Sequence, residues 1–259
     1  MSVTEPDQGR AGAAHPDEAR AGAAKGFIDR IGGGFMRSRE VAAAAEDGGY
    51  RGWQMYFAGR AGVLGDVDAD VVSASVTFFP ADFVRRAWTG SRDIEPRPAS
   101  VARYAGAAHA WGRRLLGGWE ASARLAELLG GVVEQMSVPG APLAAGWRAV
   151  PLPADAPARV VHLAHILREH RGAMHAVAVL AAGMTPLQAI LSGPGGPEGA
   201  RYFGWPAPYP DVDSTVRAAR ARVETHTDQL EAPTWAVLEG AAAAECLRLL
   251  EAAAGRTAG

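Results

Sequence analysis

Apolar residues recur at helical spacing along most of the chain. The spacing is clearest over residues 99–136 and 234–254, where leucines return every few positions. Such a period turns one face of a helix toward a core. The pattern therefore predicts a mainly α fold.

Helix start signals sharpen this prediction. Ser38 and Asp68 are expected N-caps, and Thr185, Pro186 and Gln188 have the spacing of a capping box with proline in the first turn. Together with the apolar period they predict helices over residues 38–47, 51–60, 68–79, 81–88, 99–136, 158–171, 173–183, 213–230 and 234–254, and one that begins at the capping box.

Two segments without this period divide the chain. Residues 1–25 are rich in Ala, Gly, Asp, Glu and Pro, which predicts a disordered tail. Residues 137–157 hold five prolines and are expected to be an extended connection. It would join an N-terminal helical half, 26–136, to a C-terminal half, 158–259.

The segments on either side of Gly183 have helix-turn-helix form. In a winged helix a reading helix would come next, but residues 193–210 are rich in Gly, Pro and aromatic residues. Proline costs about 3 kcal/mol inside a helix, so we expect a loop there. The loop could cover a pocket, contact another protein, or be held on the surface by its own rings. The fold class predicted is two helical halves related to winged-helix or helix-turn-helix units, with a degenerate wing region.

Charge and composition limit the partners. The net charge is −2, so no overall positive field draws in DNA or anionic lipid, and specific DNA binding is not expected. No signal peptide or membrane-spanning run is seen, which predicts a cytoplasmic protein without membrane contact. Cys246 is the single cysteine, so a disulfide within the chain and a Cys-rich metal site are excluded, and we interpret it as a core residue.

The densest polar cluster lies in the segment 158–175. It comprises His162, His165, Arg168, Glu169, His170, Arg171 and His175. On a helix, the first two histidines and Glu169 share one face, but the spacing is not the His-x-x-x-His of a zinc helix, and no metal is expected. His170 has apolar neighbours at helical spacing, which favours a hydrogen-bonded core histidine. Arg168, Glu169 and Arg171 fit a functional site and a solvated face about equally well.

A second cluster surrounds Arg60, on an aromatic helix with Trp53, Gln54, Tyr56 and Phe57. A buried guanidinium needs an anion, which would be either a ligand or a carboxylate of the chain. Glu46, Asp66 and Glu169 are the candidate carboxylates. No phosphate loop, dinucleotide fingerprint or nucleophile motif is present, so no cofactor is predicted.

Several short blocks resemble a known family. They are YFAGRA at 56–61 with LG at 64–65, FFP at 78–80, LREHRG at 167–172 with His175, and AP-x-W at 232–235. Together they resemble a family of actinobacterial proteins usually labelled helix-turn-helix, over residues 40–255. The resemblance implies a helix-turn-helix fold and, by analogy, DNA binding. The chain departs from the family pattern at 193–210 and 32–36, which fits a paralogue in specialised metabolism such as antibiotic biosynthesis, with the reading helix and wing lost.

Three hypotheses follow. The first is a cofactor-independent enzyme, or a subunit of one, that carries out elimination, substitution or ring closure on a small anionic substrate; the sulfated substrates of aziridine formation are one case. Arg60, Tyr56, Gln54, Arg168 and Arg171 would bind the substrate, and His175, His165 or Glu169 would take a proton. The second is a ligand-responsive winged-helix regulator. The third is a non-catalytic subunit of a homo- or hetero-oligomer that uses the loop 193–210 as its contact.

Overall fold

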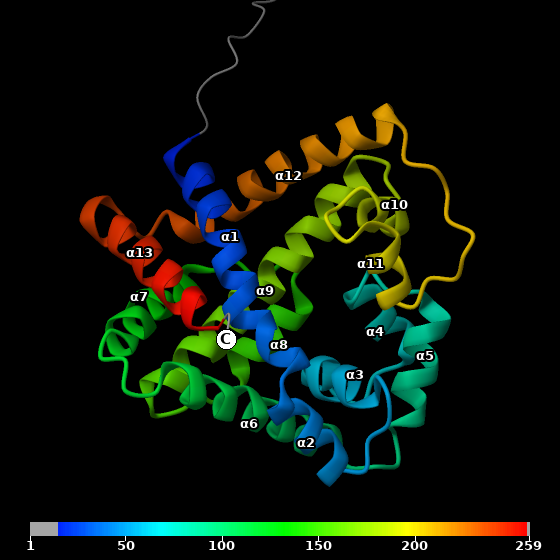
Figure 1. Cartoon of the computed structure of the whole chain (residues 1–259), viewed down its shortest axis with the longest axis horizontal. Coiled ribbons are helices and arrows are strands. Elements are labelled where there is room, and N and C mark those ends of the chain that lie inside the picture. Colours follow the sequence, from blue (N-terminus) through cyan, green and yellow to red (C-terminus); the bar gives the residue numbers. More distant parts are fainter. Residues whose placement is uncertain (1–14, 258–259) are drawn as a thin grey trace, which may run out of the picture.

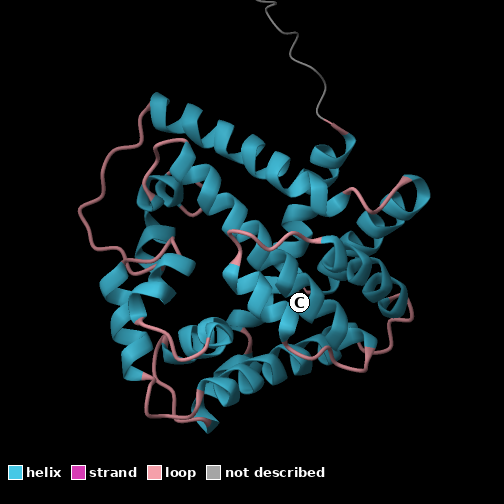
Figure 2. Ribbon diagram, turned by 180° about the vertical axis from the view of Figure 1, so that it is seen from behind, coloured by secondary structure: helices cyan, strands magenta, loops and turns pink. Residues whose placement is uncertain are grey.

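The computed structural model describes residues 15–257, and these residues form helices and loops without any strand (Figure 1, Figure 2). The predicted mainly α fold is confirmed. In chain order the helices are α1 (Pro16–Gly34), η1 (Phe35–Arg37), α2 (Arg39–Asp47), α3 (Gln54–Ala61), η2 (Gly62–Leu64), α4 (Ala69–Ser75), α5 (Ala81–Gly90), α6 (Arg97–Leu116), α7 (Ser122–Gln135), α8 (Pro142–Ala149), α9 (Ala156–Ala181), α10 (Pro186–Leu191), α11 (Gly196–Tyr202), α12 (Ser214–Trp235) and α13 (Gly240–Arg256).

Helix α9 is the central element. It runs unbroken for 26 residues and packs against α1, α6, α7, α8 and α12 (Figure 1). The largest cluster of buried apolar residues takes side chains from α1, α6, α7, α9 and α13. A second, aromatic cluster joins α3, α4 and α5, and a small third cluster joins the end of α9 to α10 and α12. The functional side chains described below project from the helices that these three clusters hold in place.

The predicted helix starts are confirmed where a side chain caps the helix. The Ser38 hydroxyl accepts from the backbone N–H of Val41, and Asp68 accepts from that of Asp70. Thr185 and Gln188 form the complete capping box at the start of α10. Each cap satisfies N–H groups that the first turn of a helix leaves without a partner.

Three segments expected to lack helix contain one. Residues 16–25 of the predicted tail lie in α1, the connection 137–157 holds α8, and the loop 193–210 holds α11. The prolines at the starts of α8 and α11 stand in the first turn, where a helix does not need their N–H group. Residues 1–14 of the predicted tail are outside the part that the structure describes.

Two predictions of helix ends were wrong at glycines. The two helices expected over 158–171 and 173–183 are one helix that passes through Gly172, whereas the single helix expected over 99–136 is broken at Gly118, where φ is +73°. In α1, a Cβ on Gly32 would lie 2.3 Å from the carbonyl oxygen of Ala164. Glycine is therefore needed there for α1 to cross α9 closely, and it does not end the helix.

Candidate functional site

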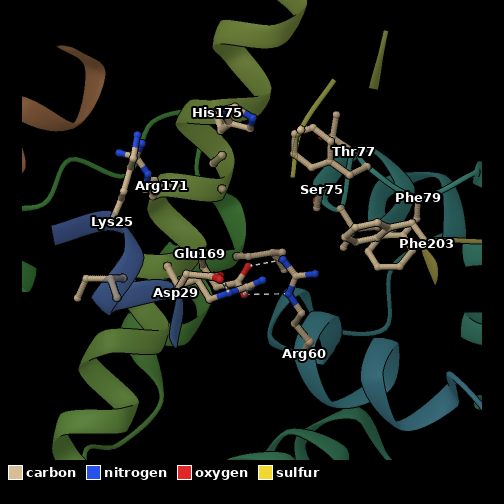
Figure 3. A pocket seen from close by; sticks show the side chains of 18 of the residues that line it. Lys25, Asp29, Arg60, Ser75, Thr77, Phe79, Glu169, Arg171, His175 and Phe203 are labelled. Atoms are coloured by element: carbon tan, nitrogen blue, oxygen red, sulfur yellow. Dashed lines mark hydrogen bonds and ion pairs between the residues drawn. The ribbon is translucent and has the colours of Figure 1, made fainter. Parts of the chain in front are cut away.

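A cavity of about 680 Å³ lies between α9 and the turn that joins α4 to α5 (Figure 3). Helices α1, α3 and α12 and the segment from α10 to α11 complete its walls. Five cationic and three anionic side chains line it, beside the rings of Phe78, Phe79 and Phe203. The lining thus combines apolar walls with an excess of positive charge, which suits a small anionic molecule.

One end of the cavity, which we call the Arg60 end, is formed by Tyr56, Arg60, Arg168 and Glu169. Arg60 donates from Nε to Oε1 and from Nη2 to Oε2 of Glu169, each over 2.8 Å, and from Nη1 to the Tyr56 hydroxyl over 2.5 Å. Every nitrogen of this guanidinium therefore has an acceptor within the chain, and a fork-to-fork pair of this kind is strong and directional. Figure 3 shows the pair at the base of the cavity.

Close helix packing brings the two partners of this pair together. Helices α3 and α6 approach so closely at Gly59 that a Cβ on this residue would lie 2.5 Å from the Cβ of Tyr104. Glycine is therefore required at this position. The indole of Trp147 donates to the Arg60 carbonyl oxygen over 2.9 Å. These contacts hold the end of α3 against α6 and α8, which both pack against α9, and Glu169 projects from the middle of α9.

The electrostatics of the Arg60 end keep the pair ionised. Burial by itself raises the pKa of Glu169, but the charge of Arg60, with further contributions from His165 and Arg168, more than offsets it and lowers this pKa to about 2. Burial lowers the pKa of Arg60, and the adjacent Glu169 raises it well above its usual value. Arg168 donates to Asp29 over 2.9 Å and to Glu169 over 3.3 Å. Its remaining nitrogen, Nη2, has no partner among residues 15–257.

The other end of the cavity, which we call the Arg220 end, is formed by Lys25, Arg171, His175, Arg220 and Glu224. Arg220 donates to Glu224, and Lys25 reaches the same carboxylate over 3.0 Å. Arg171 donates to Asp228 over 2.7 Å. Three cations thus face two carboxylates. Within the described chain, Nη1 of Arg171 and Nε of Arg220 are buried without a hydrogen-bond partner.

His175 presents a free ring nitrogen to this end. Its Nδ1 lies 3.0 Å from the hydroxyl oxygen of Thr227, and that hydroxyl donates its only hydrogen to the carbonyl of Val223 over 2.7 Å. Nδ1 must therefore be the donor, so Nε2 carries a lone pair. Burial, followed by the charge of Arg220, lowers the pKa of His175 to about 4. At neutral pH the ring is an uncharged proton acceptor that lines the cavity.

Most of the predicted site residues line this cavity. They are Tyr56, Arg60, Arg168, Glu169, Arg171 and His175. Two do not. Gln54 donates instead to the carbonyl of Gly90 over 2.8 Å. His165 is buried behind the wall, where Nδ1 donates to the Gly32 carbonyl over 3.1 Å and burial lowers its pKa to about 3.

The remaining histidines of the predicted cluster have other surroundings. His170 is the hydrogen-bonded core histidine that the sequence favoured, since its nitrogens lie 2.5 Å from Glu231 and 2.8 Å from the Ser137 carbonyl. His162 pairs with His109 over 2.9 Å. Within residues 15–257, no group of three or more His, Cys, Asp or Glu side chains is placed to hold a metal ion.

Lys25, Arg220 and Glu224 also line the cavity but were not predicted from the sequence. Lys25 lies within the segment that was predicted to be a disordered tail. Arg220 and Glu224 are four residues apart on α12, and that spacing alone reads as a solvated ion pair on a helix surface. Only the packing of α12 and α1 against α9 brings the three side chains to the cavity.

Comparison with known proteins places the chain in a family. No curated protein and no solved structure matched it. Over the described residues, no helix is both long and apolar enough to cross a membrane. A family model described as a helix-turn-helix family matches residues 21–258, which is nearly the whole chain. The chain therefore belongs to this helix-turn-helix family.

Proposed function

We propose that the cavity binds a small anionic molecule and that the chain acts on it as a cofactor-independent enzyme or as a subunit of one. The observation that carries the proposal is a cavity with an excess of cationic side chains beside an uncharged histidine whose Nε2 is free to accept a proton. Electrostatic stabilisation of a leaving anion and a positioned base are the two contributions that elimination, substitution or ring closure requires.

The proposed reaction assigns one role to His175 and another to the cationic side chains of the cavity. His175 Nε2 removes a proton from carbon in an elimination, or from an amine or hydroxyl in a substitution or ring closure. The freed electron pair forms the new bond, and the bond to the leaving group breaks. The departing anion, a carboxylate, phosphate or sulfate, accepts hydrogen bonds from cationic side chains that line the cavity. Glu169 and His165 are positioning residues in this scheme, because Glu169 is paired with Arg60 and His165 lies outside the cavity.

The test begins with a thermal-shift screen of small carboxylates, phosphates and sulfates, followed by NMR analysis of each binder for turnover. We expect release of the anionic group with the wild-type chain and none with His175→Gln, while binding persists. Equal amounts of product from the wild type and from His175→Gln would refute the role of His175 as the base. Binding without turnover in either would refute the enzyme and favour a ligand-responsive regulator.

That regulator is the second candidate, and the family match favours it. The end of α9, the turn at Gly183 and α10 form its helix-turn-helix segment. However, α10 contains no Lys or Arg, whereas phosphate contacts dominate affinity for DNA. We therefore propose that the chain makes no specific duplex contact. Fluorescence anisotropy with upstream DNA over a salt series tests this, and nanomolar, salt-sensitive binding would establish the regulator instead.

A further inference from the structure

A smaller cavity of about 200 Å³ adjoins the main one. It lies against α10, α11 and the turn between them. The two cavities have six lining residues in common: Phe78, His175, Gly193, Pro194, Phe203 and Arg220. They therefore meet at the Arg220 end, and a ligand held there can extend into both.

The walls of the smaller cavity are apolar apart from His175 and Arg220. Ile190 and Phe78 supply side chains, and glycines supply open space. A Cβ on Gly199 would already lie 3.4 Å from Cγ2 of Ile190, so a larger side chain at this position would fill the space. A dry apolar cavity of about 150 Å³ accommodates benzene, so a group up to one ring in size fits a space of this order.

Arg220 has hydrogen-bond donors to spare where the cavities meet. Its Nη1 donates to Glu224, its Nε is buried without a partner, and its Nη2 has none among the residues that the structure describes. Gly193 does not cover Nη2 of Arg220, since even a Cβ on Gly193 would lie 3.8 Å from this nitrogen. Lys25 and Arg171 add positive charge beside it, and two carboxylates balance only part of the total. An anion near Arg220 would complete this charge balance.

We propose that Arg220 binds the anionic group of the ligand and that the smaller cavity binds an apolar group, up to one ring in size, attached to that anion. The inference rests on the proposed function and narrows its ligand to compact amphipathic anions, of which an aryl phosphate or aryl carboxylate is an example. The segment from α10 to α11, which lines the smaller cavity, would then determine which apolar groups bind.

The experiment compares inorganic phosphate with phenyl phosphate by isothermal titration calorimetry of the full chain. The wild type should bind phenyl phosphate at least about tenfold more tightly, because the ring leaves water for an apolar cavity. Gly199→Leu should abolish this preference and leave phosphate binding within about twofold. Gly106→Leu is the matched control, since Gly106 is an exposed helical glycine with open space around its Cβ position, and it should change neither value.

Arg220 is tested in the same titrations. Arg220→Gln should weaken both ions by about tenfold or more, and Arg220→Lys should recover only part of that loss because lysine cannot donate in a fork. Melting temperatures identify any variant that does not fold, and Arg220→Lys keeps the charge if the glutamine variant is unfolded.

The outcomes separate the two proposals. A preference for phenyl phosphate that survives Gly199→Leu, or binding that is unaffected in Arg220→Lys and Arg220→Gln, would overturn the inference and leave the anion at the Arg60 end. Loss of anion binding in Arg168→Gln, with binding retained in Arg220→Gln, would also overturn the inference and place the anion at the Arg60 end. Failure of the wild type to bind either ion would overturn the proposed function and this inference with it.

Discussion

The two ends of the cavity carry similar side chains but differ in how fully these are paired. At the Arg60 end, all three nitrogens of a buried arginine have acceptors supplied by Glu169 and Tyr56. At the Arg220 end, three cations share two carboxylates, and buried donors of Arg171 and Arg220 remain unpaired. A saturated arginine stabilises the fold, whereas an unsaturated one retains hydrogen bonds for a ligand.

The difference divides the cavity into a structural end and a ligand end. The sequence left a ligand or a carboxylate of the chain as the anion for Arg60, and Glu169 is that anion. Arg220, which has two nitrogens without a partner among the described residues, lies 160 residues further along the chain, on α12. Three predictions test this division and another tests the crossing of α1 and α9, from the largest expected effect to the smallest.

The first concerns stability at the Arg60 end. Arg60→Ala should lower the free energy of unfolding by about 3–5 kcal/mol, because it leaves the carboxylate of Glu169 buried without its main partner. Urea denaturation measures the loss. Arg60→Ala combined with Glu169→Ala should cost less than the sum of the two single variants, which identifies the pair as the source.

The control for this prediction is Arg85→Ala, which removes an exposed arginine paired with Asp70 and Asp82. Its stability should equal that of the wild type within error, since exposed pairs contribute little. A small effect in Arg60→Ala, similar to that of the control, would mean that the Arg60 end is not the structural end.

The second prediction concerns the close crossing of α1 and α9. Gly32→Ala should lower the free energy of unfolding by about 1–3 kcal/mol, because the added methyl would collide with the Ala164 carbonyl. Gly26→Ala, on the same helix with nothing within 4 Å of its Cβ position, should be neutral or stabilise by up to about 1 kcal/mol. Equal effects in the two variants would contradict the crossing geometry.

The third prediction is a loss of stability in acid at the Arg220 end. The pKa of His175 is lowered to about 4 in the folded chain from about 6.5 in a free side chain. Between these values the unfolded chain binds more protons, so the stability that His175 contributes is complete above pH 6.5 and falls as the pH drops toward 4. We expect His175→Gln to flatten the curve of unfolding free energy against pH in this window by about 1–2 kcal/mol. Identical curves for wild type and variant would reject the prediction.

The fourth prediction compares one histidine from each end by NMR. Phosphate bound beside Arg220 should raise the pKa of His175, because an anion opposes the charge that helps to lower it. The shift should be about one unit, and the pKa of His165, behind the Arg60 end, should stay unchanged. Equal movement of both would place the anion elsewhere in the cavity.

The sequence was sufficient for features that depend on local chemistry. Ser38, Asp68 and the Thr185–Gln188 box predicted helix starts correctly, because a cap is made by residues two or three positions apart. The helical character of most of the chain followed from its apolar period. Glu169 was among the three partners proposed for Arg60, since a buried arginine calls for a carboxylate.

The sequence was insufficient for features that depend on contacts between helices far apart in the chain. Gly32 lies in a helix that the sequence did not predict, and its role follows only from the crossing of α1 and α9. Pro142 and Pro197 read as breakers unless their place in the first turn is known. Arg220 and Lys25 belong to no motif, and only the three-dimensional arrangement of α1, α9 and α12 makes them neighbours of His175. Of the arginines with free donors at the cavity, Arg168 and Arg171 were predicted site residues, whereas Arg220 was not.

The unbroken helix α9 has a mechanical consequence. At 26 residues and about 1.5 Å per residue it is a rod about 39 Å long. Glu169, Arg171 and His175 project from its middle, and its last turn leads through Gly183 to α10. A rod without a hinge transmits torque, so a ligand that turns α9 about its axis at the cavity would also turn the base of α10. Ligand binding and the position of α10 would then be coupled through α9.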